Sequence, residues 1–255
     1  MKRILTILLT TILLISCTST KDLMKKVVVN NTEFYPIDPV EYGWTIPYVD
    51  TTTNLIGKRE LIKASKTEIT DFLKNQGTLV SIIENTINGE LNYGASKVSS
   101  KNSYYRIVMD YTKYKNHHTK FGEAKVGVGL RLVAKVKTSN NKVNLGDLFA
   151  LGLAAEANHL EGTLSVDVIG MDSKDITNIL PFQSEINKTT IQNVMQALAS
   201  IKAKIYDKDT DLYPHILSIK PNLGYGEMDL NTYNKELALK RDEVVKLLSV
   251  KKTGK

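Results

Sequence analysis

The clearest pattern along the chain is an alternation of apolar and other residues between positions 126 and 137. The apolar members are Val126, Val128, Leu130, Leu132, Ala134 and Val136. Successive side chains of a strand point to opposite faces, so this spacing predicts a β-strand whose apolar face covers a core. The residues between them are small at one end of the segment and charged at the other.

Period-two alternation also occurs in residues 91–98, 104–114, 162–171 and 213–219, and it predicts four further strands. Turn-forming residues occupy positions 99–102, so we expect the first two of these strands to form a hairpin. Asn116, His117 and His118 follow the second strand and predict the next turn.

Helical spacing begins after Ser65. Ser65 and Glu68 fit a capping box, in which the hydroxyl and the carboxylate each bind a backbone amide of the first turn. This helix is expected to end near Gly77. A second stripe predicts a helix over residues 79–87 that Asn88 and Gly89 terminate, and its members are Leu79, Ile82, Ile83 and Ile87.

Four more helices are predicted in the second half of the chain. Residues 145–159 are apolar on nearly all sides, which predicts burial between layers. Ser173 is expected to cap a short helix over residues 175–180. A helix that begins at Thr189 and another over residues 229–248 each carry one apolar stripe.

The order of these elements favours an α+β fold. Strands and helices alternate irregularly, so we predict an antiparallel sheet of about four to six strands packed with helices, plus a C-terminal helix. Residues 61–221 would form the core domain, and residues 222–255 the C-terminal helix and a basic tail. Residues 17–60 contain Trp44 and several prolines, and they read as a tether and an irregular wrap. Trp44 would anchor this wrap to the domain or serve as a ligand platform.

The first seventeen residues form a secretory signal. Lys2 and Arg3 precede an apolar segment over residues 4–15, which is too short for a spanning helix of about 20 residues. The following Leu14-Ile15-Ser16-Cys17 resembles the lipobox of bacterial lipoproteins. The resemblance implies that residues 1–16 are removed and that Cys17 is diacylated and becomes the mature N-terminus. A plain secretory signal with a chance cysteine and a retained spanning helix are the alternatives.

The lipoprotein resemblance carries further implications. Two acyl chains anchor a protein stably to a membrane. In a Gram-negative cell, Thr18 after the lipidated cysteine implies the outer membrane. Cys17 is the only cysteine, so no disulfide can form within the chain.

Composition excludes few classes of protein. Apolar residues make up 42% of the chain, which suffices for a core. Residues 1–16 hold two basic and no acidic residues, so their removal lowers the net charge from +7 to +5. This excess is too weak to predict binding to nucleic acid.

The sequence contains little that points to catalysis or metal binding. We find no Gly-x-Ser-x-Gly elbow and no His-Glu-x-x-His motif. Asp207, Asp209 and Asp211 imitate the start of a calcium loop, but Leu212 replaces the required glycine and Ser218 the required glutamate. We therefore predict no cofactor and no metal.

One segment of aromatic and basic residues is a possible binding surface. Its members are Tyr104, Tyr105, Arg106, Tyr111, Lys113, Tyr114 and Lys115. Such a surface could stack on sugars or hold anionic polymers, including lipopolysaccharide or peptidoglycan. A half-exposed strand has a similar composition without any ligand.

Three hypotheses about function follow. The first is a non-enzymatic envelope lipoprotein that binds or assembles with an envelope protein or polysaccharide. The second is a hydrolase whose two carboxylates lie about 5–10 Å apart. The third is a membrane-active assembly protein that inserts the apolar residues 145–157.

Overall fold

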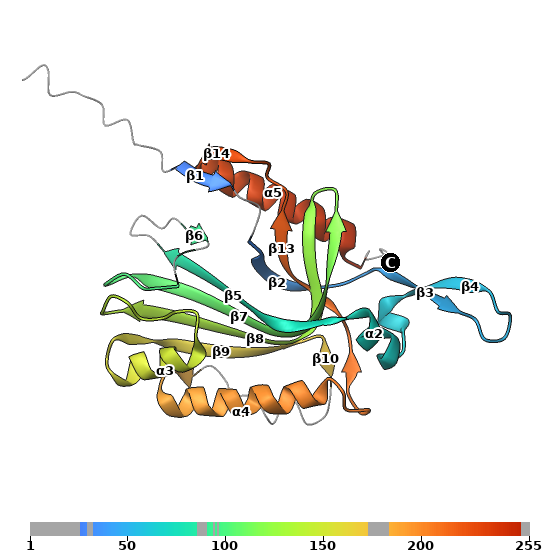
Figure 1. Ribbon diagram of the computed structural model, residues 1–255, viewed down its shortest axis with the longest axis horizontal. Coiled ribbons are helices and arrows are strands. Elements are labelled where there is room, and N and C mark those ends of the chain that lie inside the picture. Colours follow the sequence, from blue (N-terminus) through green and yellow to red (C-terminus); the bar gives the residue numbers. More distant parts are fainter. Residues whose placement is uncertain are drawn as a thin grey trace, which may run out of the picture.

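An antiparallel sheet of eight strands organises the fold (Figure 1). The computed structural model describes residues 26–29, 33–85, 91–93, 95, 97–172 and 184–250. The main path of the sheet runs through β11 (Ser184–Glu185), β9 (Leu160–Ile169), β8 (Gly122–Thr138), β7 (Tyr104–Thr119), β5 (Asn75–Asn85) and β6 (Leu91–Tyr93). β13 (His215–Pro221) joins β8, and β2 (Tyr35–Glu41) joins β13. The predicted α+β class is confirmed.

The long β7–β8 hairpin is the centre of this sheet. Its register runs without interruption from Tyr104 opposite Lys137 to Thr119 opposite Gly122. The strand predicted from position 126 is therefore confirmed. The turn predicted at residues 116–118 is wrong, because β7 continues to Thr119. Tyr42 contacts this extension, since its hydroxyl lies 2.6 Å from Nδ1 of His117.

β8 changes its second neighbour along its length. Residues 122–127 pair with β13, whereas residues 129–138 pair with β9. The closed end of the β7–β8 hairpin consequently turns away from the rest of the sheet and lies beside β13 (Figure 1). β2 and β13 cover part of the polar face of the hairpin, so the charged Lys125 and Arg131 are buried there.

β5 corrects the prediction of a helix over residues 79–87. All eleven residues of β5 pair with β7. Ile82 and Ile83 point to opposite faces of the sheet and each is only 3% exposed. Tertiary burial of both faces therefore outweighs the helical spacing. Residues 86–89 of that prediction lie outside the described residues.

The predicted hairpin of residues 91–98 with 104–114 is also wrong. β6 covers only Leu91–Tyr93 and pairs with β5. β7 pairs with β5 and β8. The two segments are therefore separated by β5 in the sheet.

The described part of the chain contains four α-helices, which pack around the sheet. They are α2 (Lys66–Phe72), α3 (Leu148–Glu156), α4 (Lys188–Lys204) and α5 (Leu230–Leu248). The capping box of Ser65 and Glu68 is present, although α2 ends at Phe72 and Gly77 belongs to β5. The helices predicted from Thr189 and over residues 229–248 are confirmed as α4 and α5. The helix predicted over residues 175–180, with its cap Ser173, lies outside the described residues.

α3 and α4 cover one face of the sheet, and α5 packs against β13 (Figure 1). The prediction that α3 is buried between two layers is wrong. Leu148 and Leu151 face the core, but Phe149 is 52% exposed and Leu153 46% exposed. α3 therefore has one free side.

Short strands complete the structure outside the main sheet. They form the pairs β1 (Lys26–Val29) with β14 (Gly226–Asp229), β3 (Thr45–Val49) with β4 (Ile56–Glu60), and β10 (Met171–Asp172) with β12 (Asp211–Leu212). A 3-10 turn, η1 (Leu61–Lys63), connects β4 to α2. Across the described ranges, no helix combines the length and apolar character needed to span a bilayer.

Candidate functional site

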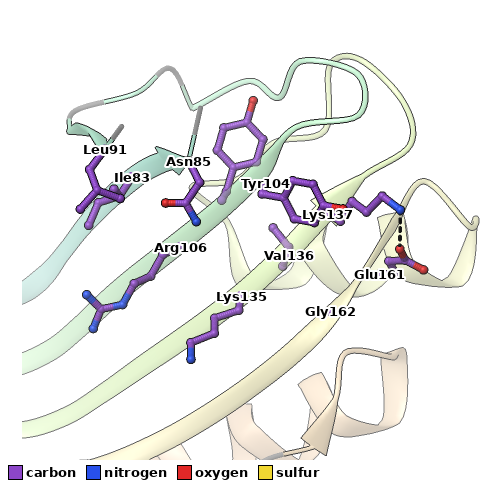
Figure 2. A pocket seen from close by; sticks show the side chains of 11 residues that line it. Ile83, Asn85, Leu91, Tyr104, Arg106, Lys135, Val136, Lys137, Glu161 and Gly162 are labelled. Atoms are coloured by element: carbon purple, nitrogen blue, oxygen red, sulfur yellow. Dashed lines mark ion pairs between the residues drawn. The ribbon is translucent and has the colours of Figure 1, made fainter. Parts of the chain in front are cut away.

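A hollow of about 500 Å³ opens at one end of the sheet, where β5, β6, β7, β8 and β9 contribute side chains (Figure 2). We call it the sheet-end hollow. Its apolar part includes Ile83, Leu91 and Tyr104. Its charged part consists of Arg106, Lys135, Lys137 and Glu161.

Strand register explains how these residues meet. Arg106 lies opposite Lys135, and Tyr104 lies opposite Lys137, so the four side chains share one face of the hairpin. That face is opposite the one covered by α3 and α4. Ile83 lies opposite Arg106 on the other side of β7 and extends the same face. The hollow thus combines apolar and basic groups on a rigid sheet.

Positive charge dominates the sheet-end hollow. Lys137 lies 3.2 Å from Glu161, and this hydrogen bond raises the pKa of the Lys137 ammonium. Arg106 and Lys135 form no ion pair with any described residue. Two cations are therefore available to a ligand next to apolar side chains.

The aromatic and basic segment predicted as a binding surface does not form one surface. Alternation along β7 places Tyr104, Arg106 and Tyr114 on one face and the other four members on the opposite face. Tyr104 and Arg106 line the hollow. Tyr114 lies farther along the strand, where its ring is 4.2 Å from Nζ of the buried Lys125.

The remaining residues of the predicted binding surface contact other groups of the protein. Tyr105 borders the hollow, but it is only 3% exposed and its hydroxyl accepts a hydrogen bond from the Ser100 amide at 2.8 Å. Tyr111 lies near Lys202 of α4, and Lys113 lies near Tyr206. The Lys115 ammonium lies 4.4 Å from the centre of the Phe72 ring.

Lys135 and Lys137 are the basic residues of the hollow that the predicted binding surface did not include. They lie 31 and 33 residues after Tyr104 in the chain, and only strand register brings them to the same face. A charged end of the strand over residues 126–137 was recognised in the sequence. The residues opposite this charged end, Arg106 and Tyr104, could not be identified without knowing that β7 and β8 form a hairpin.

Trp44 and the adjacent His117 and His118 contact neighbouring side chains of the protein itself. Trp44 is 40% exposed, and its ring meets His117 edge to face at a centroid distance of 4.4 Å, as an anchor for the loop would. His117 is half-buried, and burial lowers the pKa of its imidazole. His118 lies 3.5 Å from Glu123.

The loop that imitates a calcium site holds a lysine ammonium. Nζ of Lys66 donates to the carbonyl oxygens of Asp207 and Thr210, the latter at 2.9 Å. Lys204 pairs with the Asp207 carboxylate at 3.0 Å. Among the described residues, no three His, Cys, Asp or Glu side chains are grouped so as to hold a metal ion.

Lys66→Met is expected to lower the free energy of unfolding by about 1–2 kcal/mol, because hydrogen bonds from a charged donor to the loop are lost. The methionine keeps most of the apolar stem. Lys208→Met, in the same loop but exposed, is the matched control and should change stability by less than about 0.5 kcal/mol. Urea unfolding monitored by circular dichroism measures both. Equal stability of the two variants would contradict a structural role for Lys66.

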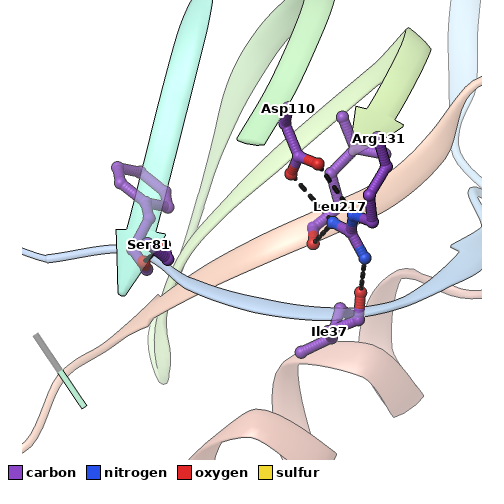
Figure 3. Close-up of polar contacts among 6 residues, drawn as sticks. Ile37, Ser81, Asp110, Arg131 and Leu217 are labelled. Carbon is purple, nitrogen blue, oxygen red and sulfur yellow. Dashed lines mark hydrogen bonds and ion pairs between the residues drawn. The ribbon is translucent and has the colours of Figure 1, made fainter. Parts of the chain in front are cut away.

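A buried ion pair lies under β2 and β13 (Figure 3). Arg131 donates from Nε and Nη2 to the two carboxylate oxygens of Asp110, at 2.7 and 2.8 Å. The same guanidinium donates to the carbonyl oxygens of Ile37 in β2 and Leu217 in β13. Arg131 therefore holds three parts of the sheet together.

Comparison with known proteins identifies no relative. No protein-family model matches the chain, and neither a curated protein nor a solved structure matches it. The features that point to a function are therefore the chemistry of the sheet-end hollow and the predicted signal at residues 1–17.

Proposed function

We propose that this chain is a membrane-anchored lipoprotein of the bacterial envelope and that it acts as a non-enzymatic binding or assembly module. The observation that carries the binding role is the sheet-end hollow, in which Arg106 and Lys135 lie beside an apolar surface. The anchor rests on the lipobox at residues 14–17. Cys17 lies outside the described residues.

The chemistry of the hollow favours a ligand segment with an anionic group next to an apolar group. The planar guanidinium of Arg106 can bind a carboxylate or phosphate through two hydrogen bonds, and Lys135 adds a compact charge. Tyr104 and Leu91 offer exposed apolar surface to the rest of the segment. The volume of about 500 Å³ falls within the usual range of ligand pockets.

A hydrolase is favoured less than a binding module. Glu161 is the one carboxylate among the described residues that line the hollow, and it is paired with Lys137. A glycosidase mechanism requires two carboxylates across the cleft. A Ser-x-x-Lys spacing does occur at Ser139 and Lys142, but the Ser139 hydroxyl donates to the carbonyl oxygen of Asn158 at 2.8 Å.

A photo-crosslinker in place of Tyr104 is expected to give one discrete adduct in cells that produce the full chain. Tyr104 lines the hollow and is 52% exposed, so a bound segment would lie within reach of the probe. The adduct is separated by electrophoresis and identified by mass spectrometry.

Tyr225 is the control position for this experiment, because it is 89% exposed and does not line the hollow. Arg106→Glu in the crosslinking chain should remove the Tyr104 adduct. An adduct that forms equally from Tyr225, or one that survives Arg106→Glu, would contradict binding at the hollow.

Cys17→Ser is expected to abolish incorporation of labelled fatty acid, because the thiol that accepts the diacylglyceryl group is lost. The measurement is metabolic labelling with an alkyne palmitate followed by gel fluorescence. Ser16→Ala leaves the thiol in place, keeps a small residue before it, and serves as the comparison variant. Labelling that persists in Cys17→Ser would refute the proposed anchor.

A further inference from the structure

The β3–β4 hairpin projects from the body of the protein as an arm (Figure 1). Its two strands pair with each other and with no other described strand. Val49 lies opposite Ile56 near the tip, and they are 59% and 79% exposed. Leu55 is 68% exposed beside them. An apolar surface this open on a projecting element is typical of an interaction site.

Contacts at its base hold the arm in place. A two-stranded hairpin alone is marginally stable in water. Here Ile46 is buried at the root, and the Arg59 guanidinium lies 4.3 Å from the centre of the Tyr48 ring. Arg59 also pairs with Glu68 of α2 at 3.2 Å. The arm therefore presents its tip in a defined position, which lowers the entropy cost of docking.

The tip carries one carboxylate next to its apolar residues. Asp50 accepts hydrogen bonds from the amides of Thr52 and Thr53, at 2.8 and 3.2 Å. These bonds lower the pKa of the Asp50 carboxyl, so it is charged at neutral pH. A fixed charge is costly in the hydrocarbon of a membrane, whereas it suits a surface that combines cations with apolar groups.

The sheet-end hollow is such a surface, and it lies at the other end of the molecule. We propose that the arm tip of one copy docks into the sheet-end hollow of a second copy, with Asp50 facing Arg106 and Lys135. Leu55 and Ile56 would then cover the apolar part of the hollow. This inference rests on the proposed binding role of the hollow.

The positions of arm and hollow determine the kind of assembly. β3 and β4 lie at one end of the longest axis of the molecule, whereas β6 and the adjacent ends of β5 and β7 lie towards the other (Figure 1). A chain therefore cannot fill its own hollow with its own arm. The contact is head to tail, and repeated contacts of this kind form rings or filaments.

Mixing of two complementary variants tests the proposal. Ile56→Asp damages the arm and leaves the hollow intact, whereas Arg106→Glu damages the hollow and leaves the arm intact. Full chains are purified in one mild detergent and studied by sedimentation velocity. We expect the unaltered chain to form species larger than dimers as concentration rises. Each variant alone should associate more weakly, by a factor of at least about ten.

An equal mixture of the two variants should form a dimer that does not grow, because only one functional contact can form. Asp50→Lys combined with Arg106→Glu in one chain should restore association by exchanging the charges. Leu239→Asp alters an apolar side chain on α5 that is 52% exposed, and it should leave association unchanged. These results together would support docking of the arm in the hollow.

Several outcomes would overturn the self-docking while leaving the proposed function separately testable. A monomer at all concentrations, or a mixture that stays monomeric, excludes it. Binding to vesicles of anionic phospholipid that depends on Ile56 and not on Arg106 would identify a membrane as the occupant instead. If the Tyr104 adduct contains a different protein and the chain stays monomeric, the hollow binds a partner but not the arm. If that adduct contains two copies linked through residues 49–56, the proposal is supported.

Discussion

Arg131→Met is expected to lower the free energy of unfolding by about 3–5 kcal/mol, the usual cost of removing one partner from a buried ion pair. Asp110 is fully buried and Arg131 is 3% exposed. The substitution leaves the Asp110 carboxylate without its cation. It also removes the donors to Ile37 in β2 and Leu217 in β13, whose carbonyl oxygens lose a partner. The effect should therefore extend to the attachment of both strands.

Urea unfolding monitored by the fluorescence of Trp44, the only tryptophan, measures this change. Lys135→Met is the matched control, because Lys135 is on the same strand and face but is exposed. It should alter the free energy of unfolding by less than about 0.5 kcal/mol. Asp110→Asn combined with Arg131→Met removes the isolated charge and should recover part of the loss. If Arg131→Met and Lys135→Met unfold at the same urea concentration, the pair does not stabilise the sheet.

Features fixed by local chemistry could be predicted from the sequence. Ser65 and Glu68 are three residues apart, and their capping box forms as expected because it needs no distant partner. The alternation over residues 126–137 was equally reliable, since Val126 to Val136 place their apolar face against the core. The same holds for the stripe of α4. Short-range spacing was sufficient in these cases.

Features fixed by distant segments could not be predicted in the same way. Leu79, Ile82 and Ile83 have helical spacing, yet β5 forms because both faces of the sheet are covered at this point. Arg131 belongs to the second face of the strand predicted over residues 126–137, and spacing alone could not show that β2 and β13, each more than 80 residues away in sequence, cover it. The exposed or buried state of a charged strand residue depends on such partners.

The candidate site shows the same division. Tyr104 and Arg106 belong to a sequence segment that suggested binding, and both line the sheet-end hollow. Lys135 and Lys137 complete it only through the register of β7 and β8. The arm was not recognised in the sequence at all, because Val49 and Ile56 belong to a region that reads as irregular. Its apolar face exists only once the two strands pair.

Gly129→Val is expected to lower the free energy of unfolding by about 2–4 kcal/mol, through crowding and backbone strain together. Gly129 has a φ of +149°, which side-chain-bearing residues rarely adopt. A Cβ atom at this position would lie 2.3 Å from the carbonyl oxygen of Tyr111 in β7. This backbone atom is held by the sheet and cannot move aside cheaply.

Gly77→Val is the matched control for this substitution, because it places the same side chain on β5 of the same sheet. A Cβ atom at Gly77 would meet only the Tyr114 ring, at an ordinary 3.6 Å. We therefore expect Gly77→Val to change the free energy of unfolding by less than about 1 kcal/mol. Urea unfolding of both variants compares the two effects. Equal losses in the two variants would mean that the close approach of β7 does not determine the need for glycine at position 129.

Gly129 lies where β8 bends, so its substitution should also disturb the pairing of β8 with its neighbouring strands. β8 leaves β13 after Gly127 and joins β9 from Gly129 onward, so the hairpin turns out of the sheet at this point. A valine that forces β8 away from β7 would disturb the pairing with β13 and β9 at once. We expect faster amide hydrogen exchange in β13 of Gly129→Val than in β13 of Gly77→Val. Unchanged exchange in β13 would show that the bend of β8 does not depend on this glycine.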